Sequence, residues 1–159
     1  MRIGVTGHMK ITGETAEAVA EALRGHLARF DRDALVGVTC LAPGADSLFA
    51  EAILEIGVPL EVVVPSADYR RTQVPADCAV GWDAAIAAAD VVTVLPFAAA
   101  GPEAYAAANE MMLGSIDELV AVWDGRPAQD AGGTGAAVAE AGRQGVPVTV
   151  IWPQGAVRG

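Results

Sequence analysis

The 159-residue sequence predicts an α/β protein: a doubly wound, mainly parallel six-stranded sheet in three layers, with helices on both faces. Two observations predict this class. Six short runs rich in β-branched residues alternate with segments whose apolar residues recur at helical spacing. The runs also contain few polar residues, as in VVTVL and VTVIW, which is typical of parallel strands covered on both faces. At roughly 100 to 200 residues per domain, we expect one domain over residues 1–159.

Strands are expected where β-branched residues are dense, and helices where an apolar stripe follows a strand. In the first helix, Val19, Leu23 and Leu27 lie on one such stripe. Gly57 and Gly145 follow the second and fifth helices, where a glycine commonly ends a helix. The expected strands are Arg2–Thr6, Leu35–Leu41, Leu60–Pro65, Val91–Pro96, Leu119–Trp123 and Pro147–Trp152. The expected helices are Glu14–Phe30, Ser47–Ile56, Pro75–Ala89, Pro102–Ile116 and Gly133–Gln144.

Composition narrows the possible functions. Ten Lys and Arg residues against twenty Asp and Glu residues give a net charge of −10, and no basic stripe is present to neutralise the phosphates of a duplex. We therefore expect neither a nucleic-acid partner nor a membrane partner. An anionic ligand would have to be bound mainly by backbone N–H groups.

Two cysteines, Cys40 and Cys78, are too few for a disulfide framework or a zinc cluster. We expect a cytoplasmic protein without metal or cofactor. The chain begins directly with the strand-like MRIGVTG, without the pattern of a signal peptide. The most apolar stretch, Ala84–Ala100, is interrupted by Asp90 and Pro96, and it therefore predicts a helix running into a strand.

Loops that follow the strands are the expected location of a ligand site, because ligands of open parallel sheets bind beyond the carboxyl ends of the strands. After the first strand, Thr6, Gly7 and His8 offer a hydroxyl group, a close backbone approach and an imidazole. A simple turn with a solvated histidine is the alternative. After the second strand, Gly44 and Asp46 lie at a helix start that could bind an anion, although Asp46 could equally cap its own helix.

The loop after the fifth strand is rich in glycine and leads into a helix. Its N–H groups and the helix dipole could hold phosphate oxygens. The loop is neither a Walker A motif, since no Lys follows, nor a GxGxxG motif. A flexible loop with Thr134 as N-cap is the alternative. The residues expected to contact a ligand here are Asp124, Gly125, Gly132, Gly133, Thr134 and Gly135.

A fourth candidate lies on the helix expected over Pro102–Ile116. Tyr105 and Asn109 are four residues apart and therefore share one helix face, where they could stack on a base and hydrogen-bond to it. The alternative is that Tyr105, together with Met112, belongs to the core or to a subunit contact.

An ordered set of motifs spans nearly the whole chain: TGH, LAPGAD, AYAAANE, ELVAVWDG, GGTG and GVPV. The set resembles the SLOG superfamily, the Rossmann-like proteins related to the DprA and LOG families. The resemblance implies a Rossmann-like fold, a homo-oligomer, and a nucleotide-derived ligand held by the first two loops and the GGTG loop. Some members of this group cleave the N-glycosidic bond, while others sense or carry nucleotides or a molybdopterin-type cofactor.

The sequence departs from the catalytic patterns of the group. The LOG pattern PGGxGTxxE would place its Glu at Ala139, and Glu140 is one residue out of register, about 100° around the helix. The deoxyribosyltransferase pattern would place its carboxylate at Ala137. Met9 and Lys10 follow the TGH motif where an Arg is common in the group.

These departures favour a binding protein, a sensor or carrier that holds phosphate in the GGTG loop, ribose at Asp124 and the base near Tyr105 and Asn109. One alternative is an N-glycoside hydrolase of the LOG type or a deoxyribosyltransferase-like enzyme. Its catalytic residue is unknown, and the candidate carboxylates are Asp46, Glu110, Asp124 and Glu140. Another is an interaction module in which Tyr105, Met112 and Ile116 contact a second subunit.

Overall fold

The computed structural model describes residues 1–11, 13–126 and 133–157. Its six-stranded sheet has the order β4-β3-β2-β1-β5-β6, and every neighbouring pair is parallel. The predicted α/β fold is confirmed, with a sheet that is wholly rather than mainly parallel. The strands are β1 (Arg2–Gly7), β2 (Val36–Thr39), β3 (Leu60–Val64), β4 (Val91–Val94), β5 (Glu118–Val122) and β6 (Val148–Ile151).

Helices connect the strands in sequence. Within the residues that the structure describes, no helix is long and apolar enough to cross a membrane. The helices are α1 (Gly13–Leu27), α2 (Ala45–Ile56), α3 (Tyr69–Gln73), α4 (Ala79–Ala88), α5 (Pro102–Leu113) and α6 (Thr134–Gln144), with short 3-10 helices η1 (Arg32–Ala34) and η2 (Ala76–Cys78).

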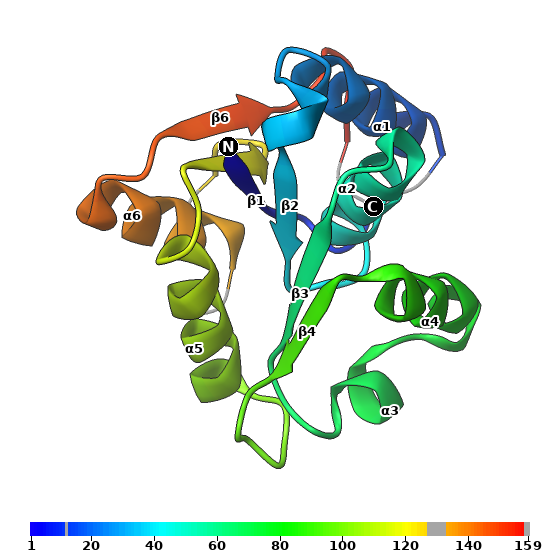
Figure 1. The fold of residues 1–159 in the computed structure, drawn as a ribbon, viewed down its shortest axis with the longest axis vertical. Coiled ribbons are helices and arrows are strands. Elements are labelled where there is room, and N and C mark those ends of the chain that lie inside the picture. Colours follow the sequence, from blue (N-terminus) through cyan, green and yellow to red (C-terminus); the bar gives the residue numbers. More distant parts are fainter. Residues whose placement is uncertain (12, 127–132, 158–159) are drawn as a thin grey trace.

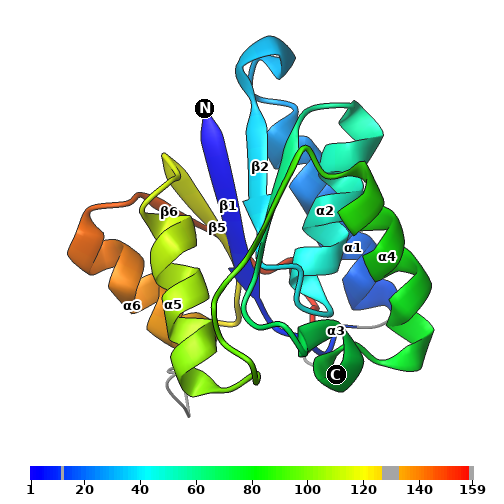
Figure 2. The same ribbon diagram turned by 60° about the horizontal axis from the view of Figure 1, so that its bottom comes forward.

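The helices cover both faces of the sheet, giving three layers (Figure 1). On one face α1, α2 and α4 bury side chains that include Val19, Phe49 and Ala85. On the other face α5 and α6 bury Met112 and Ala141. Fully burying a large apolar side chain such as Phe49 stabilises a fold by about 1.5–3 kcal/mol. The two apolar cores thus hold the strands in a fixed register. The turned view in Figure 2 shows the loops that follow the strands at the carboxyl end of the sheet.

The segment between β3 and β4 differs from the expectation in two ways. The helix expected over Pro75–Ala89 starts as the short 3-10 helix η2, with Pro75 as its N-cap, and continues as α4 from Ala79. Ahead of it lies α3, which was not expected, because its five residues are too few to show a helical period.

The VVTVL run was expected to be covered on both faces, and that expectation is wrong. It forms β4 at the edge of the sheet, where Val91, Val92 and Val94 remain 48%, 40% and 53% exposed. Val92 and Val94 align with Val62 and Val64, whose side chains lie in the core with α2. The apolar run therefore forms an edge strand whose valine side chains are partly exposed to solvent.

Two of the three side chains expected at a subunit interface, those of Met112 and Ile116, pack within this chain. Met112 is 1% exposed and belongs to the core beneath α5. Ile116 packs over Gly4, where a Cβ atom would lie only 2.7 Å from the Cδ1 atom of Ile116. These two residues thus fill the space between α5 and the sheet.

Candidate functional site

The strand order places a switch point between β1 and β5. The chain moves from β1 to β2 on one side of the sheet and returns to β5 on the other side of β1. Because ligands of doubly wound sheets bind at this point, beyond the carboxyl ends of the strands, the loops after β1 and β5 are the first candidates for a site.

The first loop is packed closely against α2. Thr6 lies half-buried within β1, and Gly7 ends the strand. A Cβ atom on Gly7 would lie 2.4 Å from the Cβ atom of Ala45 and 2.8 Å from that of Val122. Gly7 therefore allows the start of α2 to approach the end of β1. His8 continues the pairing with β5, because its N–H donates to the carbonyl of Val122 over 3.2 Å.

Gly44 joins the second loop to the first. It is the N-cap of α2 with φ 87° and ψ −123°, a conformation that favours glycine. A Cβ atom here would lie 2.4 Å and 2.5 Å from the carbonyl oxygens of Met9 and His8. The N–H of Ala45 donates to the same His8 carbonyl over 3.1 Å. The close approach that Gly44 permits is therefore to the backbone of the first loop.

Asp46 lies beneath this junction and does not cap α2, so the expectation of an Asp46 cap is wrong. Its carboxylate accepts the N–H of Ala42 over 3.1 Å, and the residue is 6% exposed. Burial raises the pKa of Asp46 from an ordinary 3.8 to about 7, while hydrogen bonds from Ala42 and Thr39 lower it. Asp46 thus bonds within the second loop, and its burial favours the protonated form.

His8 and Asp124, predicted from different parts of the sequence, lie together at the switch point. The Nε2 atom of His8 is 3.4 Å from Oδ1 of Asp124, and the backbone N–H of Asp124 donates to Nε2 over 3.2 Å. The His8 ring is 8% exposed and lies edge-on to Trp152, with ring centroids 5.4 Å apart. The N–H of Arg126 donates to Asp124 Oδ1 over 3.0 Å, with Gly125 between them at φ 84°.

The loop after β5 leads into the start of α6. Gly133 is the N-cap, with no side-chain capping bond, and Thr134 is the first helical residue, 8% exposed. The alternative expectation of a Thr134 cap is therefore wrong. Gly135 follows in the first turn, where backbone N–H groups have no partner within a helix. Gly132, a predicted contact residue, lies outside the described residues.

Tyr105 and Asn109 are half-buried on α5, which packs against β3. Tyr105 lies edge-on to Tyr69, with ring centroids 6.3 Å apart. Tyr69 begins α3 and is 3% exposed, and neither it nor that helix was expected from the sequence. Burial, together with the carboxylate of Asp68, raises the pKa of the Tyr105 hydroxyl. Asp68 was not expected either, because nothing in its local sequence predicts a contact with α5.

The candidate catalytic carboxylates are scattered. Glu140 is ion-paired to Arg143 and accepts a hydrogen bond from Gln144, all on the outer side of α6. Glu110 is exposed on α5, and Asp46 is buried. Asp124 lies beside His8, a candidate site residue from another loop. In residues 1–11, 13–126 and 133–157, no group of three or more His, Cys, Asp or Glu side chains is arranged to hold a metal ion.

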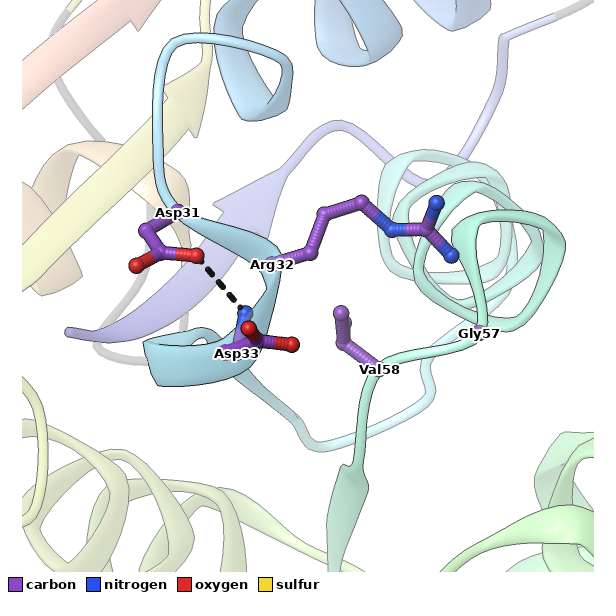
Figure 3. A pocket seen from close by; sticks show the side chains of 5 residues that line it. All are labelled: Asp31, Arg32, Asp33, Gly57 and Val58. Atoms are coloured by element: carbon purple, nitrogen blue, oxygen red, sulfur yellow. Dashed lines mark hydrogen bonds between the residues drawn. The ribbon is translucent and has the colours of Figure 1, made fainter.

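An open depression of about 490 Å³ lies at the opposite, amino end of the strands (Figure 3). Asp31, Arg32, Asp33, Gly57 and Val58 line it. The Asp31 carboxylate accepts the N–H of Asp33 over 3.0 Å, and the Arg32 guanidinium donates to the carbonyl of Ile56. These bonds close the turns before β2 and β3, so the depression has a structural explanation.

Neither a family model nor a curated protein sequence matches this chain. The parallel sheet, its switch point and its helical layers define a Rossmann-like fold, which is also the fold of DprA and molybdenum cofactor carrier proteins. The fold implied by the sequence resemblance is confirmed.

Three solved structures illustrate the similarity. DprA from Streptococcus pneumoniae has a TM-score of 0.71 and 18% identity, and covers 96% of this chain and 50% of its own. This chain thus spans half the length of that protein. DprA from Helicobacter pylori has a TM-score of 0.68 and 15% identity, and the match covers 99% of this chain and 68% of that protein's chain. The molybdenum cofactor binding protein from Rippkaea orientalis has a TM-score of 0.61 and 20% identity, and the match covers 94% of this chain and 74% of that protein's chain.

The comparison corrects the exclusion of nucleic acid. The Helicobacter pylori structure concerns the single-stranded DNA binding mode of its DprA, so a protein with this fold binds nucleic acid. The expectation of no nucleic-acid partner, drawn from the acidic composition and the lack of a basic stripe, is therefore wrong. Net charge describes the whole surface, whereas single strands are bound by local groups and by stacking on exposed bases.

Proposed function

We propose that this chain binds a nucleotide or a nucleotide-derived small molecule at the carboxyl ends of its strands and acts as a sensor or carrier of it. The observation that carries the proposal is the convergence of His8 and Asp124, from the loops after β1 and β5, at the switch point. Solved structures of the same fold include molybdenum cofactor carrier proteins, which agrees with a small-molecule role.

In this proposal the phosphate binds at the start of α6. The chain carries a net charge of −10, so backbone N–H groups and the helix dipole are better suited than side chains to attract an anion. Asp124 accepts hydrogen bonds from the ribose hydroxyls, and the base extends towards Tyr105 and Asn109. The base crosses from β5 to β3, three strand spacings or about 14 Å, which is roughly the reach of an extended nucleotide.

The proposal is tested by thermal unfolding with AMP, GMP, IMP and a single-stranded oligonucleotide, on the protein and two variants. A ligand at one hundred times its Kd should add about 2.7 kcal/mol to the free energy of unfolding. Gly133→Val should abolish this gain, because a branched side chain obstructs the approach of phosphate to the N–H groups. Gly133 has φ −77°, which valine can adopt, so the variant should fold.

Glu140→Ala is the control, because Glu140 lies on the outer side of α6 with Arg143 and should leave binding unchanged. Normal nucleotide binding by Gly133→Val would overturn the phosphate position. The same samples are analysed for free base. Released base that disappears in an Asp124→Asn variant would replace the carrier proposal with an N-glycoside hydrolase.

A further inference from the structure

The turn between β3 and α3 contains a carboxylate that joins two loops. Oδ1 of Asp68 accepts the hydroxyl of Ser66 and the backbone N–H of Ala100, each over 2.8 Å. Ser66 directly follows the carboxyl end of β3, and Ala100 precedes α5. The N–H of Ala67 also donates to the carbonyl of Phe97 over 2.9 Å. Asp68 is therefore held in place from two sides, with its position set by backbone groups.

The other carboxylate oxygen of Asp68 accepts no hydrogen bond from any residue that the structure describes. Asp68 is half-buried, and the charge of its carboxylate acts on the half-buried Tyr105. Tyr105 in turn lies edge-on to the buried ring of Tyr69. A fixed acceptor thus lies next to a partly exposed aromatic ring at the carboxyl end of β3.

An ionised carboxylate accepts hydrogen bonds and donates none, so it distinguishes heterocycles by their donors. Guanine and pterins share an edge on which a ring N–H lies beside an exocyclic amine. Adenine presents a bare ring nitrogen at the matching position, and hypoxanthine lacks the amine. A charged acceptor strengthens hydrogen bonds from such donors and repels the lone pair of adenine.

We propose that Asp68 and Tyr105 form the heterocycle subsite of this chain and select a ring N–H with an adjacent exocyclic amine, the edge shared by guanine and pterins. Tyr105 contacts the plane of the ring, and the available Asp68 oxygen accepts from its edge. The subsite rests on the proposed function, since it requires a ligand whose other end lies at the switch point.

The test is calorimetric titration of the protein with GMP, IMP, AMP and 6-hydroxymethylpterin. GMP should bind about tenfold or more tightly than IMP and AMP, in line with the discrimination that paired donors and acceptors give. In Asp68→Asn, the amide oxygen can keep the bonds from Ser66 and Ala100, while the amide nitrogen replaces the available acceptor. This variant should lose the preference for GMP, because the amide nitrogen cannot accept from the ring N–H or the amine. IMP, which keeps the ring N–H, should lose less affinity than GMP, and AMP, whose ring nitrogen is bare, should lose none.

Asp33→Asn is the matched control, because it removes the same charge from an exposed residue at the amino end of the strands. It should retain the preference for GMP. Loss of pterin binding in Asp68→Asn would support the subsite. If the pterin also binds the parent protein more tightly than GMP does, the subsite is assigned to a pterin. Equal binding of GMP, IMP and AMP would overturn the subsite but leave the proposed function standing. Absence of binding by all four compounds would overturn both.

Discussion

At the scale of single residues, the Asp46 carboxyl group makes the stability of the fold depend on pH. Its pKa is about 7 in the folded chain against an ordinary 3.8, because burial disfavours the charged form. Between these two values the folded state retains a proton that the unfolded state has lost. The free energy of unfolding should therefore fall as pH rises from 4 to 7, by up to about 1.4 kcal/mol per pH unit.

Urea unfolding of the protein and of Asp46→Asn, at pH 5 and at pH 8, measures this effect. The asparagine oxygen can still accept the N–H of Ala42 and carries no charge at either pH. The variant should therefore be more stable relative to the parent at pH 8 than at pH 5. If the free energies of unfolding of the two proteins changed with pH in the same way, the folded state would not raise the pKa of Asp46.

Residue types alone indicated which loops to consider for the candidate site. Glycine, histidine and aspartate after β1 and β5 were informative because the carboxyl ends of parallel strands meet at one edge. The pairing of His8 with Asp124 follows from that rule. Asp68 and Tyr69 could not be found in this way, because their role depends on the N–H of Ala100 and the ring of Tyr105, which are more than thirty residues away in sequence.

At the scale of elements, β4 has an unusual edge. Natural edge strands commonly carry charges, proline or bulges that discourage pairing with another chain. Val91, Val92 and Val94 are exposed instead, and β4 itself has no charged residue. The apolar pattern of such a strand looks like that of a central strand, since strand order is decided by contacts distant in sequence. This explains why the sequence did not reveal the edge.

We expect Val94→Lys to raise the temperature at which the protein begins to aggregate, because a lysine on an edge strand opposes pairing between chains. Val94 is 53% exposed, so the free energy of unfolding should change by less than about 0.5 kcal/mol. Light scattering during heating and urea unfolding provide the two measurements. Val62→Lys, which places the same charge at a residue 1% exposed, should unfold the protein. Unchanged aggregation of Val94→Lys would show that β4 does not mediate association.

At the scale of the whole molecule, the net charge of −10 repels any anionic ligand over distances beyond contact. Salt screens this repulsion, with a Debye length of about 10 Å at 0.1 M. The affinity for GMP should therefore stay constant or rise between 50 and 300 mM NaCl, as measured by calorimetry. A steep fall in affinity with salt would instead indicate counterion release from a locally basic surface.

The packing of Gly44 against the backbone of His8 and Met9 has a further consequence for the free protein. The first and second loops cannot separate without breaking the bond from the Ala45 N–H to the His8 carbonyl. That part of the candidate site is consequently preorganised, and a ligand would not have to pay the entropy of ordering these two loops. Any induced ordering would fall on other segments, so the two loops act as a rigid template against which the ligand is positioned.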